Sequence, residues 1–298
     1  MREKTIALAG TMLLVLFLFS GIAMAAGTTA ATFLSVGIGA RPEGMGGAYV
    51  AVADDANAVN INPAGLTQVK GRQVTAMHNE YLMDFTQEYI SYVDSTGQSA
   101  WGGSLIYFDY GTFEEFSTAN VFIGSFNPNS FALTAAYSVR STDSVSYGFG
   151  LKYIREKIQQ TGTAFAIDGG VIIAPPKVPW RVGAALQNLG TKEKIGSTSD
   201  SLPLTLRVGG AYNLQEYPLL IAGDIYFIKG DKPEYHLGAE YKLINIVGLR
   251  LGYNSADELD NGITFGIGFK QEAYALDYAF VPMGDFGDSH RFSLTMNF

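Results

Sequence analysis

Apolar and polar residues alternate along most of the chain, from about residue 72 to the last residue. In the final segment, Phe292, Leu294 and Met296 alternate with Ser293 and Thr295. Because successive side chains of a β-strand point to opposite faces, such a segment has one apolar and one polar face. The alternation predicts about 14 strands, near residues 72–81, 86–94, 99–110, 131–140, 144–153, 165–173, 180–187, 204–212, 219–227, 235–243, 247–254, 263–270, 274–280 and 290–298.

The connections between these segments alternate between tight and long. The tight connections are 95–98, 141–143, 175–179, 214–216, 244–246 and the turn at Gln271, and the longer or more acidic ones are 111–129, 156–162, 188–203, 229–233, 254–261 and 281–288. Short turns at one end, longer loops at the other and an even strand number are typical of outer-membrane barrels. A soluble sandwich does not require this asymmetry. The sequence therefore favours an all-β fold, a transmembrane antiparallel up-and-down β-barrel.

Charged residues on the polar faces of neighbouring strands have opposite signs. A charge that faces lipid near the middle of the bilayer costs roughly 2–4 kcal/mol, so we expect these side chains to point into the lumen. Pairing across adjacent strands would offset their loss of hydration. The expected pairs are Asp168 with Arg181, Arg207 with Asp224, Glu240 with Arg250, and Asp277 with Arg291. An ion-selective constriction is one interpretation, and we favour the other, a structural ladder that keeps the lumen filled.

The first 26 residues have the features of a secretory signal peptide. Arg2 and Lys4 precede an apolar run, and Ala23-Met24-Ala25 forms a small-x-small cleavage site. The alternative is an uncleaved membrane anchor, because the apolar run is almost long enough to span a bilayer. We predict a cleaved signal peptide at 1–26, an N-terminal hatch at 27–71 and a 14-stranded barrel at 72–298.

The segment 36–71 does not alternate and is rich in Gly, Ala and Asn. Asp54 is the expected N-cap of one short helix, and Asn62 is that of a second helix, which Pro63 begins and Gly65 ends. Such short helices are weak on their own. Many inward positions of the strands are Gly or Ala, which leaves room for this segment in the lumen. The predicted hatch residues are Arg41, Gly44, Gly46, Gly47, Asp54, Asp55, Asn57, Asn62, Pro63 and Gly65.

Charge and composition exclude two classes of function. The formal net charge is −8, and it becomes −9 without Arg2, Glu3 and Lys4, which sum to +1. An acidic exported protein is not expected to bind nucleic acid. The chain has no Cys, so it has neither disulfides nor thiol chemistry.

Three isolated motifs do not support a metal, a cofactor or an enzyme. The spacing of Asp54, Asp55, Asn57 and Asn62 matches no calcium loop, and helix capping explains both ends of this run. Gly44-Met45-Gly46-Gly47 lacks the strand, the long helix and the lysine of a phosphate loop. His290 lies close to Ser293 in sequence, but no group is placed to orient its imidazole. We predict a protein that is not an enzyme and has no cofactor and no metal.

Several segments together resemble a known family. The run GARPEGMGGAYVAVADDANAVNINPAGL (39–66) is similar to the N-terminal signature of the PorV/PorQ-type proteins, a branch of the FadL-type outer-membrane family. SVSYGFGLKYI (144–154), RVGAALQNLG (181–190) and the closing strand share the resemblance. It implies a barrel with an N-terminal hatch in the lumen. FadL-type members carry hydrophobic compounds across the outer membrane and release them through a gap in the wall, whereas PorV-type members hold or shuttle cargo of the type IX secretion machinery.

The segment 99–110 departs from the alternation, because both of its faces are largely apolar. Ile106 and Phe108 share one face with Gly102, and two adjacent glycines can bend or bulge a strand. Ordinary packing against the hatch is one interpretation, and an apolar path for a lipid-like ligand is the other. The candidate path residues, with Ile90 of the preceding strand continuing the patch, are Ile90, Gly102, Gly103, Ile106 and Phe108.

The sequence thus predicts an outer-membrane protein of a Gram-negative-type bacterium. We expect it to contact membrane lipid, and its C-terminal strand, which ends at Phe298, to contact the barrel assembly machinery. The leading hypothesis is passage of small hydrophobic compounds, with the hatch as gate. The alternative is a PorV/PorQ-like accessory or cargo-holding role in type IX protein secretion, in which the outer loops 111–129 and 188–203 bind secretion-system proteins.

Overall fold

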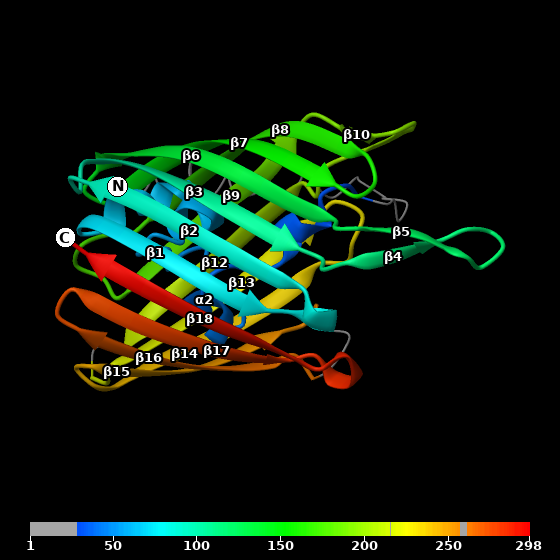
Figure 1. The fold of residues 1–298 in the computed structure, drawn as a ribbon. Coiled ribbons are helices and arrows are strands. Elements are labelled where there is room, and N and C mark those ends of the chain that lie inside the picture. Colours follow the sequence, from blue (N-terminus) through cyan, green and yellow to red (C-terminus); the bar gives the residue numbers. More distant parts are fainter. Residues whose placement is uncertain (1–28, 215, 257–260) are drawn as a thin grey trace.

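A computed structural model describes residues 29–214, 216–256 and 261–298, so the predicted signal peptide lies outside the described residues. Within these ranges, 14 antiparallel strands form a closed barrel, which confirms the predicted fold (Figure 1). The barrel strands are β1 (Gly71–Glu80), β2 (Thr86–Ser95), β3 (Ser99–Asp109), β6 (Asn129–Thr142), β7 (Val145–Lys157), β8 (Thr161–Ile173), β9 (Trp180–Gly190), β12 (Thr205–Leu214), β13 (Leu219–Ile228), β14 (Glu234–Ile244), β15 (Val247–Asn254), β16 (Ile263–Gln271), β17 (Tyr274–Pro282) and β18 (Asp288–Asn297).

The last strand closes the barrel. β18 pairs with β17 on one side and with β1 on the other, from Gln73 opposite Asn297 to Glu80 opposite His290. An open sheet would expose unpaired backbone groups at both edges, which is not tolerated in hydrocarbon. Closure explains why the terminal segment alternates up to its end.

The two ends of the barrel differ as predicted. At the short-turn end, connections such as 96–98 and 245–246 join consecutive strands directly. At the long-loop end, the hairpins β4 (Phe113–Phe116)–β5 (Phe122–Phe126) and β10 (Glu193–Ile195)–β11 (Thr198–Asp200) project past the wall (Figure 1). The short helices η3 (Leu82–Asp84) and η4 (Gly284–Phe286) also lie in loops of this end.

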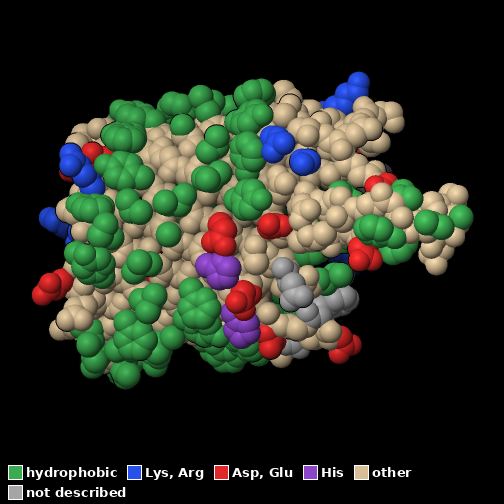
Figure 2. Space-filling model, in the orientation of Figure 1, with side chains coloured by type: hydrophobic (Ala, Val, Ile, Leu, Met, Phe, Trp, Pro, Cys, Tyr) green, Lys and Arg blue, Asp and Glu red, His purple; other side chains and the backbone are tan. Residues whose placement is uncertain are grey.

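The outer surface of the wall is apolar. The outward side chains of Leu151, Phe165, Leu237 and Leu251 are 53–62% exposed, and hydrophobic side chains are spread over the wall on the face shown in Figure 2. Such a surface matches hydrocarbon rather than water. One polar exception was not predicted, since His78 and its partner Glu88, 2.6 Å away, also face outward. His78 lies two residues before the end of β1, and Glu88 lies two residues after the start of β2, at the long-loop end.

The N-terminal segment lies inside the barrel. Residues 29–70, here called the hatch, contain η1 (Thr32–Ser35), α2 (Ala40–Gly44), α3 (Ala58–Ile61) and η2 (Pro63–Gln68), and most of their side chains are buried. α2 packs against β15–β18, whereas η2 packs against β6, β7 and β8. β1 begins at Gly71, one residue before the predicted boundary. No helix in the described ranges is long and apolar enough to cross a membrane.

Candidate functional site

Glycines on both surfaces let the hatch backbone approach the wall. A Cβ on Gly238 of β14 would lie 2.5 Å from the carbonyl oxygen of Met45, and a Cβ on Gly183 of β9 would lie 2.5 Å from that of Val50. Gly46 in the hatch has a φ of +64°, a conformation that residues with a Cβ rarely adopt. The small inward residues of the strands therefore make room for the hatch, as the sequence indicated.

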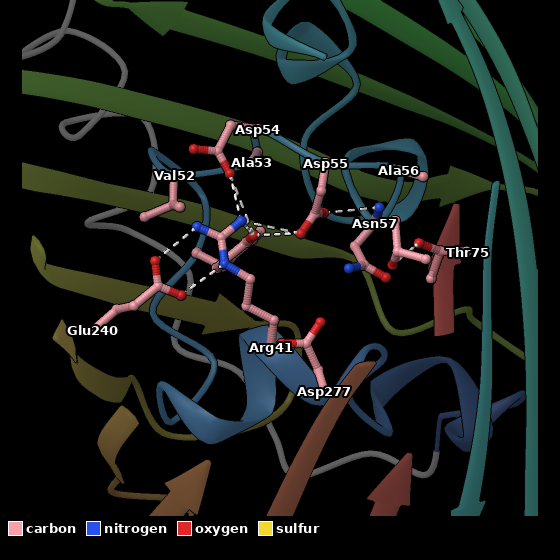
Figure 3. Close-up of polar contacts among 12 residues, drawn as sticks. Arg41, Val52, Ala53, Asp54, Asp55, Ala56, Asn57, Thr75, Glu240 and Asp277 are labelled. Carbon is pink, nitrogen blue, oxygen red and sulfur yellow. Dashed lines mark hydrogen bonds and ion pairs between the residues drawn. The ribbon is translucent and has the colours of Figure 1, made fainter. Parts of the chain in front are cut away.

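Arg41 connects two parts of the hatch to the wall (Figure 3). Its Nε donates to Oε2 of Glu240 at 2.8 Å. Its Nη1 lies 2.6 Å from Oδ1 of Asp54 and 3.2 Å from Oδ2 of Asp55. The Tyr49 hydroxyl also donates to Oδ2 of Asp55, at 2.6 Å. Because a guanidinium presents five donors in one plane, a single arginine can bind all three carboxylates.

Asp54 therefore does not have the predicted capping role. Asp54 is not an N-cap, since its carboxylate binds Arg41. α3 instead follows Asn57, whose backbone N–H donates to Oδ1 of Asp55 at 3.0 Å. Arg41 supplies the positive charge that a bound cation would otherwise supply to these carboxylates.

The second predicted helix begins as expected but ends later. The side chain of Asn62 accepts the N–H of Ala64 at 3.2 Å, and Pro63 occupies the first position of η2. η2 continues to Gln68, so Gly65 does not end it. Gly65 instead allows a close approach to the backbone of Ala53.

The wall charges contact different partners from those predicted. The Glu240–Arg250 pair is present, with Nε 2.7 Å from Oε2. Of the other three predicted pairs, Asp168 with Arg181 and Asp277 with Arg291 are wrong. Arg207 attracts Asp224 electrostatically but forms no direct ion pair with it. Within the wall, Arg250 also binds Asp277 (2.7 Å), and Lys152 binds Asp168 (3.0 Å). Three other charged residues of the wall contact the hatch. Arg291 binds Glu43 (2.8 Å), Arg181 lies 3.5 Å from Asp54, and Asp224 accepts the backbone N–H groups of Tyr49 and Val50 (2.7 and 2.8 Å). The hatch supplies several of these partners, and strand-to-strand pairing alone could not include it.

Two cavities of the lumen lie toward opposite ends of the barrel. The outer chamber, toward the long-loop end, has a volume of about 160 Å³, and Pro42, Ile61 and Ile106 contribute to its lining. The inner vestibule, at the short-turn end, has a volume of about 550 Å³, and Arg41 and Lys242 contribute to its lining. The hatch thus lies between a space that faces the loops and a space that faces the short turns.

A stack of three polar side chains lies against the outer chamber. The ring of Tyr226 lies 3.8 Å from that of His236, centroid to centroid, and the guanidinium of Arg207 lies 4.2 Å from the Tyr226 centroid. The sequence predicted an inward Arg207, but it did not predict this contact with Tyr226 and His236. Their positions on the adjacent strands β12, β13 and β14 were the available signal.

Ile106 and Phe108 face inward, as predicted. They are 4% and 2% exposed. Phe108 belongs to an aromatic cluster at the long-loop end, in which its ring centroid lies 4.8 Å from Tyr110, 5.9 Å from Tyr81 and 6.3 Å from Phe85. Ile106, two residues further along the inward face, lines the outer chamber. Apolar contacts therefore continue from the loops to the chamber.

Gly102 shares this inward face, as predicted, whereas Ile90 and the bend expected at the glycine pair differ from the prediction. Ile90 is 48% exposed and faces outward, so its predicted place on the lumen side is wrong. The ladders of β3 run through Gly102 and Gly103 without a register shift, so the glycine pair forms no bulge. Gly102 instead accommodates the hatch, since a Cβ there would lie 3.0 Å from Cγ2 of Val59.

A groove of about 400 Å³ lies on the outer surface around Ala76, with Ile90 and Leu294 in its lining. On the inner side of the same strands, the sulfur of Met77 accepts the N–H of Gly39 at 2.9 Å, and Oγ of Ser293 accepts the N–H of Ala40 at 2.9 Å. One layer of wall therefore separates this groove from the beginning of α2.

Ser293 and His290 do not form a catalytic pair. Ser293 points inward to the hatch, whereas His290 contacts the hydroxyl of Tyr278 at 2.9 Å from the opposite face of β18. The alternation of the strand separates the two side chains.

Comparisons with known proteins give one family match and several similar structures. A model of an uncharacterised protein family (UPF0164) matches residues 21–166. Among curated proteins, no relative is found. The toluene transporter TodX of P. putida has a TM-score of 0.62 at 13% identity, covering 88% of this chain and 99% of its own. The toluene transporter TbuX of Ralstonia pickettii has a TM-score of 0.60 at 13% identity, covering 88% and 98%.

A FadL homologue of Pseudomonas aeruginosa has a TM-score of 0.57 at 11% identity, covering 92% of this chain and 99% of its own. This chain shares the fold of these barrels. The fold agrees with the resemblance to the FadL-type family, whereas the PorV/PorQ branch stays a prediction.

Proposed function

We propose that this protein is an outer-membrane channel for small hydrophobic compounds, with the hatch as gate. The apolar outer surface suits insertion in a bilayer, and barrels of the same fold include two toluene transporters. Export by a cleaved signal peptide and insertion through the barrel assembly machinery belong to the same proposal. Nothing in this function requires a catalytic group.

The partly buried aromatic cluster at the long-loop end carries the proposal. Phe108, Phe85 and Tyr110 pack together where the loops meet the lumen, and Ile106 continues this apolar side into the outer chamber. A compound with little polar surface gains free energy by leaving water for such a surface, roughly 25 cal/mol per Å² of apolar area that is buried. The cluster thus offers an entry that an open aqueous pore lacks.

The wall around Ala76 offers the exit. Met77 and Ser293 hold the beginning of α2 on the inner side, and the groove lined by Ile90, Leu105 and Leu294 lies outside. A compound that displaces the side chain of Met77 would leave the lumen sideways, toward hydrocarbon. Ile90 would then line the outer lip of the path rather than its interior.

Uptake by a charged variant tests the path. In Ile106→Asp combined with Phe108→Asp, the two carboxylates make the apolar side costly to enter, so uptake of radiolabelled toluene into proteoliposomes should fall at least roughly tenfold. The matched control is Phe116→Asp combined with Phe122→Asp, which adds the same charges to the exposed β4–β5 hairpin. Heat-modifiable migration on gels checks that each barrel is folded. Unchanged uptake by a folded path variant would contradict the proposal.

The β4–β5 hairpin supports a second candidate function, that of holding a protein partner in type IX secretion. It projects from the long-loop end, and Phe116, Val121, Phe122 and Ile123 are 49–59% exposed there. Exposed apolar groups outside the membrane are typical of interaction sites. Loss of co-purifying secretion components from the Phe116→Asp, Phe122→Asp variant, with toluene uptake unchanged, would favour this function over transport.

A further inference from the structure

The inner vestibule is lined by bound carboxylates and by lysines that are not bound. Arginines bind all four carboxylates of its lining: Asp54, Asp55 and Glu240 contact Arg41, and Asp277 contacts Arg250. The lining also includes Lys70, Lys242 and Lys270, and none of these lysines has an ion-pair partner among the described residues. Although the chain has a net charge of −8, the uncompensated charge of this cavity is positive.

Two of the lysines lie on either side of a floor made of glycines. Lys242 of β14 is opposite Gly248 of β15, Gly248 is opposite Gly268 of β16, and Lys270 follows two residues later on β16. Neighbouring strands are about 4.8 Å apart, so the backbones of the two lysines are separated by roughly 10 Å. The glycines place no side chain in this gap.

Both lysines are accessible from the short-turn end. Their side chains are exposed, although they lie on the inward face of the wall, which Glu240 and Gly268 share. Solvent in the vestibule therefore reaches them, whereas membrane lipid does not. The short-turn end of an outer-membrane barrel faces the periplasm.

The size and the walls of the vestibule suit a ligand that carries negative charge. Its volume of about 550 Å³ is within the range of about 300–1,000 Å³ that is common for ligand pockets. A cleft with charge of one sign and walls of low dielectric constant concentrates its electric field on an entering ligand. A lysine ammonium offers three donors to carboxylate oxygens.

The separation of the lysines favours a ligand with several carboxylates. A single small anion would have to draw both lysine side chains together. In an extended peptide, side chains on alternate residues point the same way and lie about 7 Å apart, so two carboxylates can each bind one lysine. Further acidic residues of the same peptide can extend toward Lys70, which also lines the vestibule. Linking the carboxylates in one chain strengthens binding without new contacts.

We propose that the inner vestibule is a docking site for an acidic segment of a periplasmic protein, whose Asp or Glu side chains bind Lys242 and Lys270. The inference goes beyond the proposed channel function and does not depend on it, because the apolar path leaves the lumen through the wall and not through the vestibule.

Binding of a synthetic acidic peptide tests the docking site. We expect fluorescently labelled hexaglutamate to bind the purified, detergent-solubilised full-length barrel in anisotropy titrations, and hexaglutamine to bind at least roughly tenfold more weakly. In Lys242→Gln combined with Lys270→Gln, the affinity for hexaglutamate should fall at least roughly tenfold.

The matched control is Arg72→Gln combined with Lys177→Gln. It removes the same two positive charges at the same end of the barrel, but both side chains are exposed and neither lines the vestibule. The control should bind hexaglutamate as the wild-type protein does. Heat-modifiable migration on gels checks that each barrel is folded.

Three outcomes would overturn the inference. Equal binding of hexaglutamate and hexaglutamine by the wild-type protein excludes an acidic ligand. Unchanged affinity in the folded Lys242→Gln, Lys270→Gln barrel, or an equal loss in the control, excludes the vestibule as the site. Displacement of the peptide by free glutamate at an equal concentration of carboxylate groups assigns the site to small anions. None of these measurements involves toluene uptake, so failure of the docking site and failure of the channel function are distinguishable.

Discussion

The two halves of the hatch are held in different ways. The first half, residues 29–57, is anchored by charges: Arg41 binds Glu240, Arg291 binds Glu43, and Asp224 accepts two backbone N–H groups. The second half, residues 58–70, is held mainly by apolar packing and by hydrogen bonds to neutral side chains of the wall. Two arginines also contact it: Arg140 donates to the Thr67 carbonyl, and Arg181 donates to Oε1 of Gln68 at 3.4 Å.

The difference indicates which half can move. A buried ion pair that loses one partner leaves an uncompensated charge, at a cost of about 3–5 kcal/mol. A neutral hydrogen bond contributes only about 0.5–1.5 kcal/mol net. The second half also lies beside β3, where Val59 packs against Gly102. We therefore expect residues 58–70 to move and to open the apolar path, while residues 29–57 stay fixed.

Removing the charge of Arg41 should have the largest effect on the stability of the hatch. Arg41→Ala leaves Glu240, Asp54 and Asp55 without the guanidinium between them, and we expect a loss of about 3–5 kcal/mol in the stability of the hatch. Hydrogen exchange of the amides of residues 40–57 should accelerate accordingly, and the conductance of single barrels in planar bilayers should rise because the plug loosens.

Arg72→Ala is the matched control for Arg41→Ala. Arg72 also pairs with a carboxylate, Asp94 at 3.0 Å, but its side chain is 63% exposed. Exposed pairs contribute about 0–1 kcal/mol, so exchange in the hatch should not change. Equal effects of the two substitutions would contradict a charged anchor.

A neutral contact should give a smaller effect, confined to the second half. In Thr67→Val the 2.8 Å hydrogen bond between Thr67 and Ser146 is lost, at a cost of about 1–2 kcal/mol. Exchange of amides 58–68 should accelerate while amides 40–57 keep their protection, and toluene uptake should increase. The control Thr118→Val, in the exposed β4–β5 hairpin, should change neither amide exchange nor toluene uptake. Loss of protection in both halves together would show that the hatch moves as one body.

The most local effect should come from pH, in the loop that contains Glu193 at the long-loop end. Burial, with Glu156 adding to it, raises the pKa of Glu193 to about 7 from 4.5. The folded loop then holds a proton that the opened loop releases, so loop stability falls as pH rises from about 4.5 to 7 and is constant above this range. Proteolysis within 191–204 should be faster at pH 8 than at pH 5, and Glu193→Gln should abolish the difference. The same pH dependence in Glu193→Gln would assign it to another group.

The sequence of β2 did not predict which of its faces points into the lumen. Tyr89, Ser91 and Val93 face inward and Glu88 and Ile90 face outward, so both faces mix apolar and polar residues. A shift of one residue exchanges the faces of a strand, and alternation cannot fix the register when neither face is uniform. The pairing of β2 with β1 and β3 sets this register in the folded barrel.

The sequence by itself determined the barrel, the number of strands, the two unequal ends and the presence of a filling segment. These features follow from the period of two and from turn residues, which are local. Only the tertiary structure decided which charges meet. Arg41 and Glu240 are 199 residues apart in the chain, and a contact of that range depends on how the hatch enters the lumen. No local pattern records that geometry, because the same inward charges would satisfy strand pairing in an empty barrel.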